Sequence, residues 1–326
     1  MRIVVLDASP ASTGDLSWDA FDALGQVTIH QQTTPEQLRP RCAEADAVLT
    51  NKVPITAADF AALPRLRYVG VLATGVNVID LPAARQHNVV VTNVAGYSTA
   101  HVAQHVFALL LELTNGCGPL AEDVRAGGWT RSTTFAYWKR PPVELDGLCM
   151  GVVGFGDIGR RVARIAGAFG MGVRVHTRRP PANGAGVGTE NGPRFGPLDE
   201  LLENSDVVSL HCPLTEQTRG LIGSAQLARM KPTAYLINTA RGPLIDEAAL
   251  AQALQQGRIA GAGLDVLSAE PPPAHAEHTQ ALIQAPNCVI TPHIAWASLA
   301  ARRRLIAQAA ANLAAFAQGS PINVVN

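Results

Sequence analysis

The sequence predicts two doubly wound α/β domains, because short apolar runs alternate with helical patterns in two separate stretches of the chain. Apolar strands that alternate with helices indicate a parallel sheet covered by helices on both faces. A length of 326 residues fits about two domains, each large enough to bury its own core. The hydrophobic share of 47% and the zero net charge exclude a disordered chain.

The first alternation occupies residues 1–95. Strands are predicted at residues 3–7, 47–50, 68–72 and 89–92, and helices at residues 57–63 and 81–87. Ser98 then has the residue type of a helix N-cap, and a long apolar helix is predicted over residues 99–113. A helix with so few polar positions is expected to be buried between two bodies.

Residues 116–144 show neither period and are predicted to be irregular. They contain many aromatic residues for a loop, at Trp129 and within residues 135–138. Aromatic side chains in an irregular segment are typical of a partner surface, and we expect a homodimer that forms through residues 98–145. The alternative is that these side chains pack on their own domain.

A second alternation begins at Leu148. Strands are predicted at residues 148–153, 172–177, 206–210, 234–239, 261–265 and 288–291, and helices at residues 157–169, 198–203 and 246–256. A helix over residues 297–318 follows, and we expect it to return to the first domain. The predicted organisation is a domain of residues 98–295 inserted into a discontinuous domain of residues 1–97 and 296–326.

The charge balance and the cysteines describe the expected surroundings. With 26 basic and 26 acidic residues, the chain lacks the basic excess that drives nucleic-acid binding. No window approaches the roughly 18 consecutive apolar residues that span a bilayer, so no membrane partner is expected. The five cysteines form no CxxC pair, and the N-terminal apolar run is too short for a signal peptide. The sequence therefore predicts a cytoplasmic protein.

A glycine-rich turn follows the strand predicted from residue 148. The motif Gly154-Phe155-Gly156-Asp157-Ile158-Gly159 joins this strand to a helix, which is the context that a dinucleotide fingerprint requires. The first glycine permits the turn, the second lets the backbone approach a pyrophosphate and the third allows close helix packing. The pyrophosphate then meets the positive end of the helix. The alternative is a glycine turn that binds no ligand.

The next predicted strand ends where an NAD site carries an acidic residue for the adenosine ribose. Thr177 occupies that position, and Arg178 and Arg179 follow it. A carboxylate would repel a 2′-phosphate, whereas two guanidinium groups attract it. We therefore expect NADP(H) to be favoured over NAD(H), the alternative being that both arginines are solvated loop residues.

Three residues with catalytic potential follow predicted strands, at the edge where doubly wound sheets bind ligands. Arg241 offers a planar guanidinium group for the carboxylate of a 2-keto acid. His293 can protonate the substrate oxygen as hydride reaches the neighbouring carbon, or accept that proton in the reverse direction. Glu270 would orient this imidazole and favour its protonated form. The three residues together predict acid–base catalysis in an oxidoreductase.

Two further histidines, His101 and His105, have the i, i+4 spacing of a metal pair. No carboxylate follows at an interval that would supply a third ligand. We therefore predict no metal site.

With these motifs, essentially the whole sequence resembles the D-isomer-specific 2-hydroxyacid dehydrogenase family. Besides the glycine turn, the shared motifs are Ser205-Asp206-Val207-Val208-Ser209-Leu210-His211-Cys212-Pro213-Leu214, Met230-Lys231-Pro232, residues 237–246, Gly263-Leu264-Asp265-Val266 and Thr291-Pro292-His293. The segments Asn51-Lys52-Val53, Ala73-Thr74-Gly75-Val76-Asn77 and His293-Ile294-Ala295-Trp296 look most like those of the glycerate dehydrogenase (hydroxypyruvate reductase) branch.

The resemblance implies a Rossmann nucleotide-binding domain inserted into a flavodoxin-like substrate domain, with Arg241, Glu270 and His293 as catalytic residues. The glycine turn and the end of the next strand predict cofactor contacts at Gly154, Gly156, Asp157, Ile158, Gly159, Thr177, Arg178 and Arg179, and the resemblance adds His211, Cys212, Pro213, Thr239, Ala240 and Asp265. The Thr177-Arg178-Arg179 stretch departs from the common pattern of the family, in which NAD is preferred. The implied substrate contacts are Asn51, Thr74, Gly75, Val76 and Arg241. The expected reaction moves a hydride between a nicotinamide and a small D-2-hydroxyacid or 2-keto acid, with glycerate/hydroxypyruvate or glyoxylate as the expected substrate.

Two other functions stay open. One is a dinucleotide-sensing binding protein, similar to the family's transcriptional corepressors, in which the cofactor only sets the conformation. The other is an enzyme for a different D-2-hydroxyacid, as in the phosphoglycerate dehydrogenase branch, whose members often carry a C-terminal regulatory domain.

Overall fold

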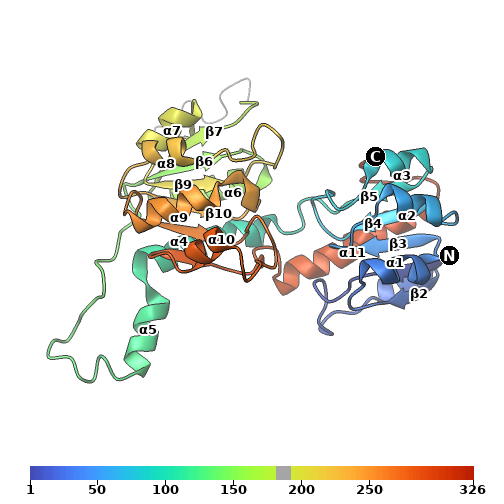
Figure 1. Cartoon of the computed structure of the whole chain (residues 1–326), viewed down its shortest axis with the longest axis horizontal. Coiled ribbons are helices and arrows are strands. Elements are labelled where there is room, and N and C mark those ends of the chain that lie inside the picture. The colour runs from blue at the N-terminus through green and yellow to red at the C-terminus, as the bar shows by residue number, and fades with distance from the viewer. Residues whose placement is uncertain (181–191) are drawn as a thin grey trace. The chain divides into compact units, whose positions relative to one another are not determined.

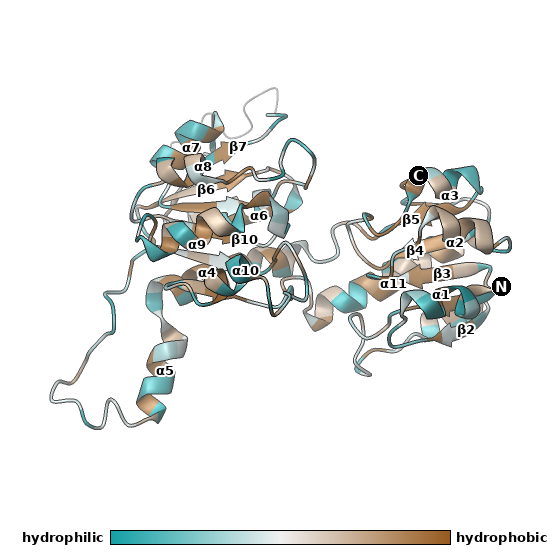
Figure 2. Ribbon diagram, viewed as in Figure 1, coloured by the Kyte–Doolittle hydropathy of each residue, from teal (hydrophilic) through white to brown (hydrophobic). Residues whose placement is uncertain are grey.

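The computed structural model describes residues 1–180 and 192–326 of the chain. The chain forms two compact units, one of residues Met1–Ser98 with Trp296–Asn326 and one of residues Thr99–Ala295 (Figure 1). Each unit contains a parallel sheet with helices on both faces, and the predicted fold class is confirmed. In both units the strands are mostly hydrophobic, whereas the exposed sides of the helices are hydrophilic (Figure 2).

The described residues of the smaller unit form a sheet of five parallel strands in the order β2-β1-β3-β4-β5. These strands are β1 (Arg2–Val5), β2 (Gln26–Ile29), β3 (Ala47–Thr50), β4 (Tyr68–Val71) and β5 (Val90–Thr92). This is the flavodoxin-like order, in which ligands bind at the carboxyl ends of β1 and β3, where the strand order reverses. Strand β2 was not predicted from the sequence, because this edge strand has mostly exposed side chains and no apolar run.

Alternating side chains of the small sheet enter separate clusters on its two faces. Ile3 and Val5 lie in one cluster and Val4 in the other. The first cluster contains residues of the 3₁₀ helix η1 (Asp19–Leu24) and of α11 (Leu299–Ala317), and the second contains residues of α1 (Pro35–Cys42), α2 (Ala57–Ala62) and α3 (Leu81–Gln86). The rings of Tyr68 on β4 and Phe316 on α11 lie 5.0 Å apart. The C-terminal helix therefore completes a core that the N-terminal strands begin.

The described residues of the larger unit form a sheet of seven parallel strands in the order β12-β11-β10-β9-β6-β7-β8. They are β6 (Cys149–Val153), β7 (Gly172–His176), β8 (Arg194–Phe195), β9 (Val207–Leu210), β10 (Tyr235–Asn238), β11 (Gly261–Leu264) and β12 (Cys288–Ile290). The chain first extends the sheet from β6 to β8 and then returns to the other side of β6 for β9. This is the Rossmann order with one strand added, and its ligands bind where the direction changes.

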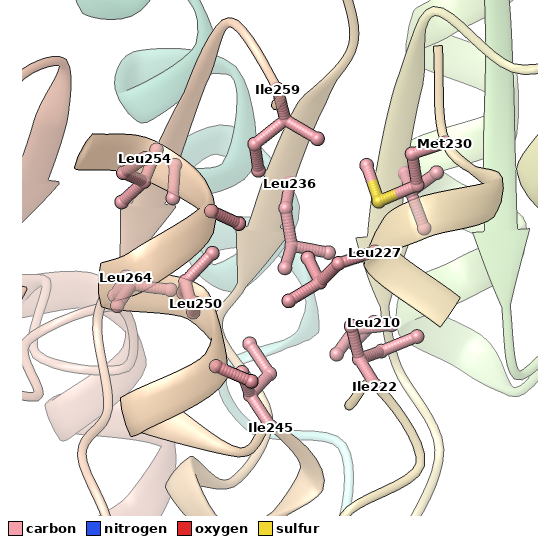
Figure 3. Packing of buried hydrophobic residues seen from close by; sticks show 14 of the residues in the cluster. Leu210, Ile222, Leu227, Met230, Leu236, Ile245, Leu250, Leu254, Ile259 and Leu264 are labelled. Carbon is pink, nitrogen blue, oxygen red and sulfur yellow. The ribbon is translucent and has the colours of Figure 1, made fainter. Parts of the chain in front are cut away.

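Helices cover both faces of the large sheet. One face carries α4 (Thr99–Asn115) and α6 (Asp157–Ala168), and the other carries α7 (Leu198–Asn204), α8 (Ser224–Arg229), α9 (Glu247–Gln255) and α10 (Glu277–Ile283). Figure 3 shows how leucines of α8, α9 and the strands interdigitate in the hydrophobic cluster on the face that carries α7 to α10. The long helix α4 contributes residues such as Val106 and Leu110 to the core of the larger unit. Within the described residues, no helix combines the length and the apolar character that a membrane span needs.

The segment predicted to be irregular contains a helix, so that prediction was wrong in part. This helix, α5 (Cys117–Arg125), projects from the body of the larger unit (Figure 1), and none of its residues is buried. Without a buried face it lacks the apolar stripe by which the other helices were predicted. The short helices α1, α8 and α10 and the two-residue strand β8 were also missed.

Leu250 of α9 tests the packing in Figure 3, because its side chain is fully buried in that cluster. We expect Leu250→Ala to lower the free energy of unfolding by about 2–5 kcal/mol through lost burial and a residual cavity. Ile283→Ala, at a side chain 41% exposed in the same unit, should change it by roughly 0.5 kcal/mol or less. Urea denaturation followed by circular dichroism measures both values, and equal losses would contradict the assigned packing.

Candidate active site

Neighbouring parallel strands bring the sequence-predicted residues of the larger unit to one edge of its sheet. In the strand register, the last residues of β6, β9, β10 and β11 are aligned across the sheet. Backbone hydrogen bonds continue this alignment past the strand ends, from His211 N to Val153 O (2.7 Å) and from Asp265 N to Asn238 O (2.9 Å). The loops that follow these strands therefore lie side by side.

The three glycines of the turn between β6 and α6 have different surroundings. Gly154 has a φ of +94°, and a Cβ added there would lie 2.6 Å from the backbone nitrogen of Cys212. A Cβ on Gly159 would overlap the carbonyl oxygen of Gly154. Gly156, in contrast, begins α6 with no atom within 4 Å of an added Cβ. Gly154 and Gly159 thus allow close packing, whereas Gly156 leaves an open backbone of the kind that a pyrophosphate needs.

The other predicted cofactor residues near the open backbone of Gly156 belong to this turn and to the end of β7. Asp157 is exposed and accepts a hydrogen bond from Arg160 (2.8 Å), whereas Ile158 packs against the core. Gly154 N donates to His176 O (2.8 Å), so Thr177 and the two arginines after it begin beside the turn. Both arginines are exposed, and no carboxylate of the described residues forms an ion pair with either.

The loops after β9 and β10 add polar and neutral groups along the same edge. Thr239 Oγ1 is buried and has no hydrogen-bond partner within the described residues. Because buried polar atoms are nearly always paired, this hydroxyl fits a bound polar group. Burial lowers the pKa of His211 to about 3 and raises the pKa of the Cys212 thiol, so both side chains are neutral at pH 7. Pro213 accepts a hydrogen bond from Thr218 at its carbonyl oxygen (2.7 Å). The residues present therefore fit a dinucleotide.

The turn that carries Arg241 is held by a buried asparagine that the sequence analysis did not single out. Asn238 Oδ1 accepts from Ala240 N (3.0 Å), and its Nδ2 donates to Arg241 O (2.9 Å). The guanidinium group of Arg241 is half-buried and donates from Nη1 to Ala240 O (2.7 Å).

Glu270 and His293, 23 positions apart in sequence, form a direct pair. His293 Nδ1 lies 2.6 Å from Glu270 Oε2, and the other oxygen, Oε1, accepts from Leu267 N (3.0 Å). The side chain of His293 is 24% exposed and that of Glu270 is 33% exposed. An ionised carboxylate has no hydrogen to donate and acts only as an acceptor, so Nδ1 of the imidazole carries the hydrogen. Nε2 then remains to exchange a proton with a substrate.

His293 has a left-handed backbone with a φ of +54°, which is unfavourable for a residue other than glycine. Asp265 opposes this strain, because its carboxylate accepts hydrogen bonds from Thr291 Oγ1 (2.6 Å), Ile294 N (2.9 Å) and Ala295 N (2.8 Å). Burial raises the pKa of Asp265, but hydrogen bonds from His105, Thr291 and these two amides outweigh burial and lower it overall. An ionised Asp265 therefore binds the chain on both sides of His293.

In the smaller unit, the loops after β3 and β4 carry the predicted substrate residues. Thr50 and Val71 are paired in register, so both loops start at one edge of the small sheet. Thr74 Oγ1 donates to Val94 O (3.1 Å), and Gly75 and Val76 follow it, each partly exposed. Asn51 Nδ2 donates to Leu72 O (2.5 Å), while the buried Oδ1 has no partner within the described residues.

Asp7, at the end of β1, was missed by the sequence analysis. Its carboxylate accepts hydrogen bonds from the backbone nitrogens of Asn51 (2.7 Å), Lys52 (2.6 Å) and Val53 (3.3 Å). Burial raises its pKa even though these donors favour the charged form. The available signal was an acidic residue directly after an apolar strand, at the edge where such sheets bind ligands.

Comparisons with known proteins show which family this chain belongs to. Residues 107–295 match the model of the D-isomer specific 2-hydroxyacid dehydrogenase NAD binding domain. The chain is 42% identical to a hydroxypyruvate reductase of Blautia hydrogenotrophica, with 100% of both chains covered. It is 40% identical to a glycerate dehydrogenase of Methylorubrum extorquens, over 90% of this chain and 89% of that one. Among solved structures it resembles an acyclic imino acid reductase in complex with NADPH and D-Arg, with 30% identity, 100% of both chains covered and a TM-score of 0.85.

The matched domain spans more than half of the chain and includes the glycine turn, Arg241, Glu270 and His293. The first two relatives extend the similarity over nearly the whole chain. The chain therefore belongs to the D-isomer-specific 2-hydroxyacid dehydrogenase family.

Proposed function

We propose that this enzyme interconverts a small 2-keto acid and its D-2-hydroxyacid, with hydroxypyruvate or glyoxylate as the keto substrate and NADP(H) favoured over NAD(H). The observation that carries the proposal is the 2.6 Å pair of His293 and Glu270. This pair follows strands of the same parallel sheet that carries the glycine turn. The names of the two sequence relatives, hydroxypyruvate reductase and glycerate dehydrogenase, support the choice of substrate.

The proposed mechanism assigns a separate task to each catalytic residue. When bound, the nicotinamide supplies the hydride for C2 of the keto acid. His293 protonates the substrate oxygen from Nε2 as negative charge develops there. Glu270 holds the Nδ1–H and stabilises the imidazolium that delivers this proton. Arg241 binds the substrate carboxylate through its guanidinium group. In the oxidative direction, His293 accepts the proton instead.

Further residues are proposed to bind the cofactor and the substrate. The pyrophosphate belongs at the open backbone of Gly156 and the start of α6, with Asp157 and Ile158 beside it. The unpartnered Thr239 hydroxyl faces the same ligand in this proposal, as do Ala240 and the loop of residues 211–213. The substrate residues proposed in the smaller unit are Asn51, Thr74, Gly75 and Val76, and the unpartnered Oδ1 of Asn51 supports this choice.

The preference for NADP(H) is proposed from the end of β7. Thr177 stands where a ribose-binding carboxylate would repel a 2′-phosphate, and Arg178 and Arg179 are exposed directly after it. The complex of the related imino acid reductase with NADPH supports this proposal.

Purified enzyme tests the proposed substrate, with the oxidation of NAD(P)H followed by the loss of the absorbance that only the reduced nicotinamide has. We expect steady oxidation with hydroxypyruvate and glyoxylate, and a loss of kcat of about 10²-fold or more in His293→Ala, because a general acid typically contributes that much. His275→Ala, at an exposed histidine, is the matched control and should keep its activity. Cofactor binding without turnover would support the dinucleotide-sensing alternative and contradict the proposal.

Arg178→Ala tests the cofactor preference. Loss of a guanidinium group from a 2′-phosphate should weaken NADPH binding by roughly 10- to 150-fold, since a hydrogen bond to a charged group contributes about 1.5–3 kcal/mol, while NADH binding stays unchanged. Fluorescence titration with both cofactors measures the two Kd values, and Arg85→Ala, on the exposed side of α3, is the control. If both Arg178→Ala and the double variant with Arg179→Ala kept the NADPH preference of the wild type, the role of these arginines in binding the 2′-phosphate would be ruled out.

We also propose a homodimer that forms through residues 98–145. The side chains of Trp129 and Trp138 are 54% and 60% exposed, and Phe135 is 92% exposed. Trp129 Nε1 donates to Phe135 O (3.0 Å), which gives the projecting segment a defined local shape. Exposed aromatic clusters of this kind are typical of protein interfaces.

Sedimentation equilibrium tests the dimer. The wild-type enzyme should have twice the mass of one chain, and the double variant Trp129→Ala with Phe135→Asp should shift toward the monomer, because hot spots at interfaces are often aromatic. Ile322→Asp changes a comparably exposed apolar residue of the other unit and should leave the mass unchanged. A monomeric wild type would contradict the proposal.

A further inference from the structure

The two histidines whose spacing resembles a metal pair both contact the segment that carries His293. His101 Nδ1 lies 2.7 Å from the carbonyl oxygen of Ala295. His105 Nε2 lies 2.9 Å from Thr291 Oγ1 and 3.4 Å from Asp265 Oδ1. One helix, α4, thereby contacts this segment two residues before and two residues after the left-handed His293.

The acceptors determine which nitrogens of the two imidazoles carry hydrogen. A carbonyl oxygen only accepts, so His101 must donate from Nδ1 to Ala295. Thr291 Oγ1 gives its own hydrogen to Asp265 Oδ1 and therefore accepts from His105 Nε2. Both imidazoles therefore act as hydrogen-bond donors to the segment.

These donors act at a strained site. A non-glycine residue in the left-handed region costs on the order of 1–3 kcal/mol and persists only where its surroundings hold it. The side chains of His105 and Asp265 are 11% and 0% exposed, so water competes little for their hydrogen bonds. The His105–Thr291–Asp265 chain fixes one end of the strained turn, and His101 fixes the other through Ala295.

We infer that His101 and His105 are positioning residues, which hold residues 291–295 so that the imidazole of His293 keeps its orientation toward Glu270 and the substrate. The inference rests on the proposed catalytic role of His293. A catalytic group displaced by about 1 Å can lose about 10²-fold in rate, so small movements of this segment have measurable effects.

The test compares variants that keep or remove each donor. Glutamine places an N–H near the position of histidine Nε2 and asparagine near that of Nδ1, so His105→Gln and His101→Asn keep the donors, whereas His105→Leu and His101→Leu remove them. Hydrogen–deuterium exchange of the peptide containing residues 291–295 reports on the segment without any turnover. We expect exchange to accelerate roughly tenfold or more in both leucine variants and to stay near the wild-type rate in the two conservative ones.

Kinetics provide the second readout. In His105→Leu we expect kcat with hydroxypyruvate to fall about tenfold or more, with the Kd of NADPH unchanged and with recovery in His105→Gln. Phe107→Leu, on the same helix but stacked on Phe169, is the control for general destabilisation and should keep its kcat. Unchanged exchange in both leucine variants, or equal defects in leucine and glutamine variants, would overturn the inference. If the wild type reduces no keto acid, the proposed function fails, and the exchange data still decide whether the histidines hold the segment.

Discussion

The parallel register of the large sheet is the constraint on which the candidate site depends. Aligned strand ends bring the glycine turn, the Arg241 loop and Asp265 to one edge, although more than a hundred residues separate the first of these from the last. A parallel sheet achieves this because every strand enters from the same side and every connection returns behind it. The proposed sites of cofactor binding and proton transfer thus follow from one topology, and Gly154 and Gly159 allow the backbone to pack closely there.

Within this frame, a buried carboxylate determines the local geometry around His293. The Asp265 side chain is fully buried and ionised, and it is satisfied only if Thr291, Ile294 and Ala295 direct their donors toward it. That requirement makes the left-handed φ of His293 tolerable. Asp7 has the same relation to the loop of residues 51–53 in the smaller unit, where three backbone amides converge on one buried carboxylate. Each unit therefore uses an aspartate at the end of a strand to shape the loop that follows a neighbouring strand.

The sequence predicted those parts of the structure that depend on local patterns. Buried strands and long helices have strong periods, and the glycine turn is recognisable from its context, so the fold class and the family could be inferred. The edge strand β2 and the helix α5 were missed because their side chains are largely exposed. Asp7 and Asn238 were missed because their importance lies in hydrogen bonds to loop backbones, which no spacing reveals. The i, i+4 pair His101 and His105 was noticed for its spacing, but only the structure shows its contacts with residues 291–295.

In the proposed reaction, a hydride passes from the nicotinamide to C2 of a small keto acid while His293 supplies the proton. The most direct test supplies hydroxypyruvate and NADPH that carries deuterium at the transferable position of C4, and analyses the product by mass spectrometry and chiral chromatography. We expect D-glycerate with one deuterium at C2, formed at a rate that falls sharply in His293→Ala. Product without deuterium at C2, L-glycerate, or bound cofactor without any product would contradict it.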